Sequence, residues 1–210
     1  RILLKKTKRM IHLWKQDSLC LKYTPYDFPG TIPTVHIEND TPGETNWILL
    51  FHIGSNHQHW PVYEKHFRNT LPTIYPPHLF ITVHPNTENA TNELIPSLND
   101  LRLQHLIIDY HIQTIPNQGS DLSSLWYTTT HAPTIWPTIQ FQTVCKIHTK
   151  GSSNLWRDTM IHDVLPSTEW VSYFLRVFIQ HPSMGMIYGY SEPYDGMNHA
   201  FVIDLSLIHI

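Results

Sequence analysis

The chain has 210 residues, enough for one α/β domain with a substantial core and too few for two domains of average size. Its formal net charge of −3 does not favour nucleic-acid binding through bulk charge. Cys20 and Cys145 give no disulfide framework, and no apolar run reaches the roughly 18–20 residues that span a bilayer. The composition therefore indicates a reducing compartment, and we expect a cytoplasmic protein.

The first 45 residues are predicted to be a lead-in that precedes the domain. Residues 1–14 place apolar side chains among lysines and arginines, which is typical of a basic amphipathic helix. Such a helix could bind peripherally to the inner face of a membrane. A helix remnant with a solvated basic face is the commoner alternative, and we favour it. Residues 23–42 are rich in proline and threonine, which is typical of an irregular linker.

Both ends of the chain look cut. The sequence begins with Arg1 rather than methionine, and Leu205–Ile210 is what a common sequencing adapter would encode. We therefore expect a fragment of a longer protein, with its α/β domain over residues 46–204. Residues 205–210 are then a non-native tail that packs poorly, and a short C-terminal strand is the alternative.

Apolar runs bounded by turn residues recur along the domain, and each predicts a buried strand of a parallel sheet. The segments between these runs have apolar residues at helical spacing. Pro96 is expected to interrupt one of these helices, Asp121 to cap the next, and Ser167 to start the last. The alternation predicts a three-layer α/β sandwich with a mostly parallel sheet and helices on both faces. The predicted strands lie at 47–53, 79–84, 106–112, 143–149 and 184–190.

Two loops at predicted strand ends carry most of the candidate ligand-binding groups. Residues 117–121 read Asn-Gln-Gly-Ser-Asp, which could bind a ligand or could simply be a capped strand-to-helix turn. Lys146, His148 and Lys150 alternate along one strand, so their side chains share a face. They could stabilise the charge that develops on a pyrophosphate leaving group, or they could be an ordinary solvated strand end.

The segment that follows holds a second charged pair, Arg157 and Asp158. Arg157 could clamp a phosphate, or the pair could hold the start of a helix. The sequence contains neither the glycine-rich dinucleotide fingerprint nor a P-loop, and it has no zinc-ligand spacing. The loops therefore do not match the common nucleotide-binding or zinc motifs.

At these residues the chain resembles the rhamnan synthesis protein F family, glycosyltransferases of bacterial and viral polysaccharide assembly. The resemblance rests on Lys146-Ile147-His148-Thr149-Lys150, on Trp156-Arg157-Asp158, and on the loop at 117–121, and it covers about residues 47 to 190. It implies a GT-A-like nucleotide-sugar-binding fold. It also implies transfer of rhamnose or a related deoxysugar from a nucleotide-sugar donor to a glycan or lipid-linked glycan acceptor.

The resemblance also implies roles for individual residues. Asp121 and His148 would be catalytic, with Asp121 acting as general base on the acceptor hydroxyl or holding a ribose or sugar hydroxyl. Basic groups stand where many GT-A enzymes carry an acidic pair that holds a metal, so we expect no metal and no other cofactor. The donor-binding set would be Asn117, Gly119, Lys146, Lys150, Trp156, Arg157 and Asp158.

A rival interpretation is a glycan-binding or scaffolding module that has no catalytic activity. Gln118 and Ser120 occupy positions where the family carries arginines, and this departure favours the rival. The intact segments at 146–150 and 156–158 favour the enzyme. Binding and hydrolysis of a nucleotide-sugar donor would distinguish the two.

Overall fold

The structure is a computed structural model of the chain. It describes the backbone of residues 10–15, 22–23, 45–54, 59–85, 88–116, 120–149, 158, 161–162, 164–180, 184–190 and 204–209. Side chains are described for residues 45–54, 59–85, 91–116, 123–149, 158, 161–162 and 164–179.

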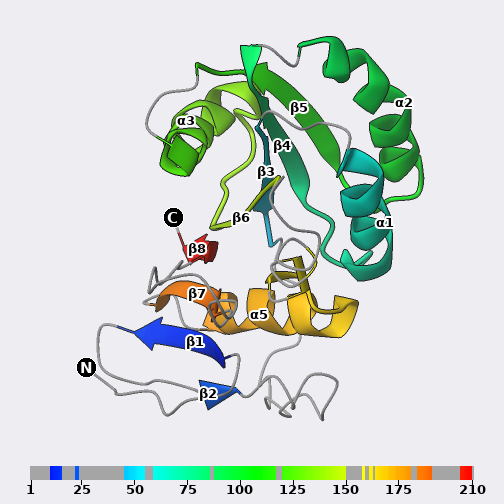
Figure 1. Cartoon of the computed structure of the whole chain (residues 1–210). Coiled ribbons are helices and arrows are strands. Elements are labelled where there is room, and N and C mark those ends of the chain that lie inside the picture. The colour runs from blue at the N-terminus through cyan, green and yellow to red at the C-terminus, as the bar shows by residue number, and fades with distance from the viewer. Residues whose placement is uncertain are drawn as a thin grey trace, which may run out of the picture.

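Four of the described strands are parallel and form one end of a larger sheet of eight described strands (Figure 1). In spatial order they are β6 (Thr143–His148), β3 (Trp47–Ile53), β4 (His78–Val83) and β5 (Asp109–Thr114). Each neighbouring pair is parallel, which confirms the prediction that these four segments lie side by side. β5 begins at Asp109, later than predicted. Leu106 and Ile107 belong to the loop that precedes it, where both are buried.

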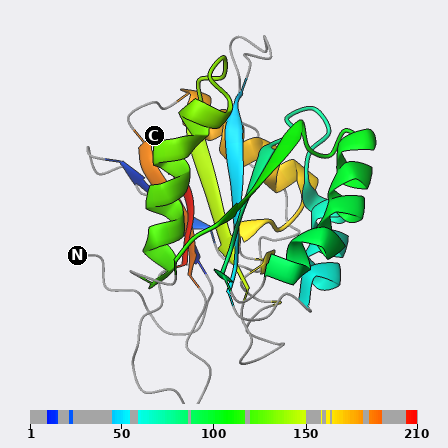
Figure 2. The same cartoon turned by 90° about the horizontal axis from the view of Figure 1, so that it is seen from above.

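Helices cover both faces of this sheet (Figure 2). The chain passes from β3 to β4 to β5 in one direction, so α1 (Trp60–Thr70) and α2 (Glu88–Leu103) lie on the same face. It then returns across the sheet to β6, and α3 (Ser120–Ile135) covers the opposite face. The predicted layering of helix, sheet and helix is therefore present around these strands.

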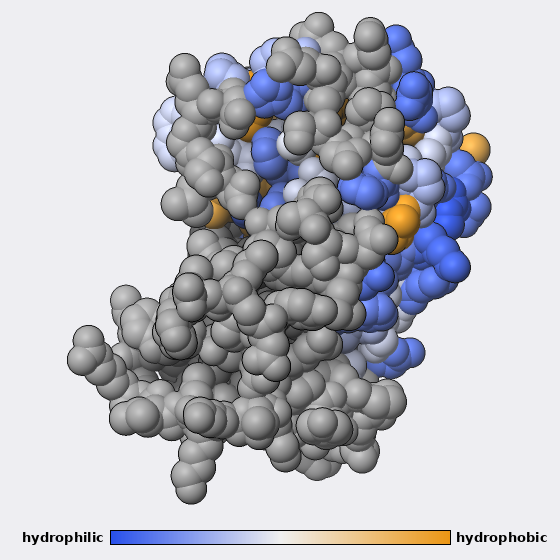
Figure 3. Space-filling view, viewed as in Figure 1, coloured by the Kyte–Doolittle hydropathy of each residue, from blue (hydrophilic) through white to orange (hydrophobic). Residues whose placement is uncertain are grey.

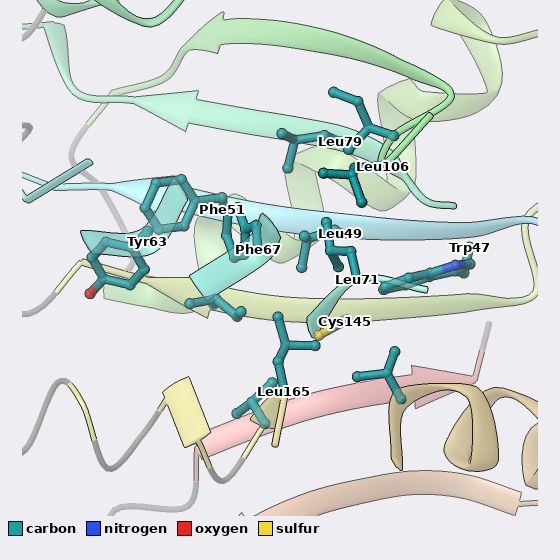
Figure 4. Close-up of a cluster of buried hydrophobic side chains, with 14 of the residues drawn as sticks. Trp47, Leu49, Phe51, Tyr63, Phe67, Leu71, Leu79, Leu106, Cys145 and Leu165 are labelled. Carbon is teal, nitrogen blue, oxygen red and sulfur yellow. The ribbon is translucent and has the colours of Figure 1, made fainter. Parts of the chain in front are cut away.

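Each face of the sheet has its own hydrophobic core. The larger core joins the sheet to α1, α2 and α5 (Thr168–Gln180), and its labelled side chains in Figure 4 include Phe51, Tyr63 and Phe67. The smaller core lies under α3 and includes Leu50, Phe80 and Trp136. Burial on both faces explains why the strand segments are continuous apolar runs rather than alternating ones.

Hydrophilic side chains dominate the outer face of α1 and α2, on the right-hand side of Figure 3. There Arg68 of α1 contacts Glu64 in the same helix and Asp100 of α2, with its Nη2 2.7 Å from the Asp100 carboxylate. Among the described residues, no helix is both long and apolar enough to cross a membrane.

The N-terminal segment differs from the prediction. Met10–Lys15 is not the end of a helix but a strand, β1, which pairs antiparallel with β2 (Lys22–Tyr23) and with β7 (Met184–Tyr190). Its β-branched and aromatic residues suit a strand, and the edge of β7 supplies the hydrogen-bonding partners. β7 runs antiparallel to both of its neighbours, β1 and the C-terminal strand. The prediction of a mostly parallel sheet therefore holds only for the four strands β6, β3, β4 and β5.

The C-terminal segment also differs. Asp204–His209 forms β8, which lies between β6 and β7 and pairs antiparallel with both. This is the short C-terminal strand that the sequence left as the alternative to a poorly packed tail. The open edge of β6 is a template for another strand, and the Leu- and Ile-rich C-terminal segment fills it.

Pro96 and Asp121 lie at other positions in their helices than predicted, and Ser167 lies where it was predicted. Pro96 lies inside α2 without ending it, and Asp121 lies within the first turn of α3 rather than before it. An acidic residue in the first turn complements the positive end of the helix dipole. Ser167 acts as predicted at the start of α5, where its Oγ accepts a hydrogen bond of 3.4 Å from the Trp170 N–H.

Candidate functional site

The sheet has a topological switch point between β3 and β6. From β3 the chain proceeds to β4 on one side, whereas β6 is added later on the other side. In open α/β sheets the loops at the carboxyl ends of two such strands diverge, and ligands bind in the crevice between them. The described part of the predicted motif, residues 146–149, runs along β6 to its carboxyl end and therefore reaches this switch point.

Lys146 and His148 both point toward the face that α3 covers. Val144 belongs to the core under α3, and strand side chains alternate, so residues 146 and 148 follow it onto that face. Lys146 is only 7 % exposed and His148 only 6 % exposed. The alternative of a solvated strand end is therefore wrong for these two residues. They form a buried basic pair.

The neighbouring strand ends are polar on the same face. His52 of β3 lies opposite His148 in the sheet, and Thr82 of β4 lies opposite His52. The Nδ1 atom of His52 is 2.8 Å from Thr82 Oγ1, at hydrogen-bonding distance. On the face under α3, Lys146 lies in the row of Leu50 and Phe80, and the next row toward the carboxyl edge is polar, with His148, His52 and Thr82.

Helix α3 adds buried hydroxyl groups to this end of the face. The ring centroid of Tyr127 in α3 lies 6.4 Å from that of Phe80, in the middle of β4. The ring centroid of Trp136, just after α3, lies 5.1 Å from that of His78, at the start of β4. The N-terminal turns of α3 therefore extend over the carboxyl edge, where Ser124 is fully buried. We call Lys146, His148, His52, Thr82 and Ser124 the carboxyl-edge cluster. A cation, two imidazoles and two hydroxyls are suited to bind an anionic, hydroxyl-rich ligand.

The structure leaves several predicted site residues undescribed. Asp121 is described only as backbone, in the first turn of α3. This places its backbone at the carboxyl edge, because α3 begins there. The predicted donor-binding residues outside the described part of the chain are Asn117, Gly119, Lys150, Trp156 and Arg157.

Asp158 is the only residue of the predicted group 156–158 that the structure describes. It is exposed, and its charge acts on His66 of α1, on the face opposite to that of Lys146 and His148. That Asp158 binds the donor stays a prediction.

His66 is held in its neutral form by its surroundings. Its Nε2 atom donates to the main-chain oxygen of Leu165 at 2.7 Å, and its ring meets His162 edge-on with centroids 4.9 Å apart. Burial, with a smaller contribution from His162, lowers the pKa of His66 from 6.5 to about 4. The Leu165 carbonyl and Asp158 oppose this shift.

Sequence reasoning missed His52, Thr82 and Ser124. Each lies in a segment that was identified correctly as strand or helix. For His52 and Thr82, the available signal was a polar residue near the end of an apolar strand, and Ser124 had no such signal. In the described part of the chain, no three His, Cys, Asp or Glu residues gather as a metal site would require. No family model, no curated protein and no solved structure matches this chain.

Proposed function

We propose that this protein is a glycosyltransferase of rhamnan-type polysaccharide synthesis, and that its nucleotide-sugar donor binds at the carboxyl-edge cluster. The observation that carries the proposal is the burial of Lys146 and His148 beside the switch point of the sheet. A buried lysine is poorly hydrated, so its charge acts more strongly on an anion beside it than an exposed lysine would, and this position is where such folds bind ligands. The resemblance of the segment 146–150 to the family supplies the reaction class.

The proposed reaction transfers the sugar from a nucleoside diphosphate to a hydroxyl of the acceptor glycan. The acceptor oxygen forms a bond to the anomeric carbon while the bond from that carbon to the phosphate oxygen breaks. The electron pair stays on the departing diphosphate, and the hydroxyl proton passes to a base, for which Asp121 is the candidate. Lys146 would bind the diphosphate and stabilise its growing charge, and His148 would donate a hydrogen bond beside it.

The second candidate is a binding module without catalysis, derived from such a transferase. It is favoured by Gln118 and Ser120, which stand where the family has arginines. Such a module would bind nucleotide sugar or glycan through the same cluster and leave the donor intact.

The test is binding and hydrolysis of a panel of nucleotide sugars that includes a nucleotide-activated rhamnose. We expect at least one donor to raise the melting temperature and to be hydrolysed slowly without acceptor. Lys146→Met should lower turnover by a factor of roughly 10²–10³, the range for loss of one charge-stabilising donor. Lys65→Met, at an exposed position on α1, is the matched control and should retain wild-type turnover.

Two results would decide against the transferase. Donor binding that depends on Lys146 without hydrolysis or transfer would favour the binding module. If no nucleotide sugar stabilised the folded protein, the carboxyl-edge cluster would not be a donor site.

A further inference from the structure

Thr149 joins the carboxyl ends of β3 and β6. Its main-chain N–H donates to the His52 oxygen at 2.9 Å, which extends the parallel pairing one residue beyond β6. Its side-chain Oγ1 accepts a hydrogen bond of 3.0 Å from the Gly54 N–H. One residue therefore ties together the strand ends that border the switch point.

Tyr63 holds the same strand end from the other face of the sheet. It is fully buried in the core between α1 and the sheet, where its ring lies 4.7 Å from Phe51 (Figure 4). Its hydroxyl donates to the main-chain oxygen of His148 at 3.1 Å. A buried phenol needs such a partner, and this bond links α1 to the last residue of β6.

These hydrogen bonds act on two consecutive residues, His148 and Thr149, at the end of the strand that carries the buried basic pair. The direction of a strand side chain follows from its backbone, so a shift of this strand end would reorient His148. A displacement of about 1 Å in a supporting group can greatly lower the rate of catalysis.

We propose that Tyr63 and Thr149 are positioning residues of the carboxyl-edge cluster. They set the orientation of His148 and Lys146 through the backbone and do not themselves contact the ligand. This inference rests on the proposed function for the identity of the ligand, a nucleoside diphosphate group. Its structural part, the effect on His148, can be measured without any ligand.

The first measurement follows the His148 imidazole by NMR in the ligand-free protein, with His148→Gln to assign its signals. Tyr63→Phe and Thr149→Val each remove one hydroxyl without a large change of shape. Both should shift the His148 signals, and Thr149→Ser should restore them because it keeps the hydroxyl. Unchanged His148 signals in both variants would overturn the proposal.

The second measurement is calorimetric binding of UDP and dTDP. Loss of one positioning hydrogen bond should weaken binding by about three- to tenfold, whereas Thr149→Ser should stay near the wild-type affinity. Tyr110→Phe and Thr130→Val are matched controls, because each removes a hydroxyl that bonds elsewhere, to Asn99 and to the Trp126 carbonyl. Equal weakening in variants and controls would mean a general loss of stability and would overturn the proposal.

The two measurements separate this inference from the proposed function. If the wild-type protein binds neither nucleotide while the His148 signals shift as expected, the donor site is wrong and the positioning effect stands. If nucleotide binds with equal affinity to all variants, the donor site stands and the positioning role is wrong. Should Tyr63→Phe fail to fold, the pair Thr149→Val and Thr149→Ser still decides the outcome.

Discussion

Replacing His66 by glutamine should remove a defined part of the pH dependence of stability. In the folded protein burial lowers the pKa of His66 to about 4, whereas the unfolded chain has the ordinary value of 6.5. Between these values the unfolded state binds more protons, so the free energy of unfolding decreases as the pH falls. The stabilisation from a neutral His66 is complete above pH 6.5 and is lost progressively as the pH falls from 6.5 to about 4.

The size of the effect follows from the same pKa difference. The full shift corresponds to ~2 kcal/mol between pH 7.5 and 5.0. His66 is only partly buried, so solvent screening reduces this value, and we expect about 1 kcal/mol. Glutamine does not titrate, and its amide can still donate to the Leu165 carbonyl.

The assay is urea unfolding of wild type and His66→Gln at both pH values. Wild type should lose about 1 kcal/mol more than the variant between pH 7.5 and 5.0. His105→Asn, at an exposed position after α2, is the control for the loss of a surface imidazole. An identical pH dependence in wild type and His66→Gln would refute the reasoning, because His66 would then titrate alike in both states.

Three further outcomes are expected. Phe51→Ala should lower the free energy of unfolding by about 3–5 kcal/mol in urea, because Phe51 is fully buried against Trp60, Tyr63 and Phe67; a loss below about 1 kcal/mol would contradict this packing. Ser167→Ala should cost about 1 kcal/mol through loss of the α5 cap, and unchanged stability would show that cap to be weak. Donor hydrolysis should survive EDTA if Lys146 supplies the positive charge, and restoration by manganese after EDTA inactivation would disprove it.

Local sequence pattern was sufficient for the central sheet and for the strand that carries the basic residues. Runs such as 47–53 and 79–84 are mostly apolar, and burial on both faces is the simplest arrangement that such runs allow. The two-residue period of a strand also places Lys146 and His148 on one face, whatever packs against that face. These properties depend on neighbours within a few residues, so the sequence itself records them.

The tertiary structure decided which contacts reach the site. The hydrogen bonds from Tyr63 to His148 and from Gly54 to Thr149 join residues 85 and 95 positions apart, and nothing in the local pattern of either partner indicates the other. The same reason explains β1, whose partner β7 is distant in sequence. Periodicity specifies which side of its own element a residue occupies. Which other elements pack there depends on the fold as a whole.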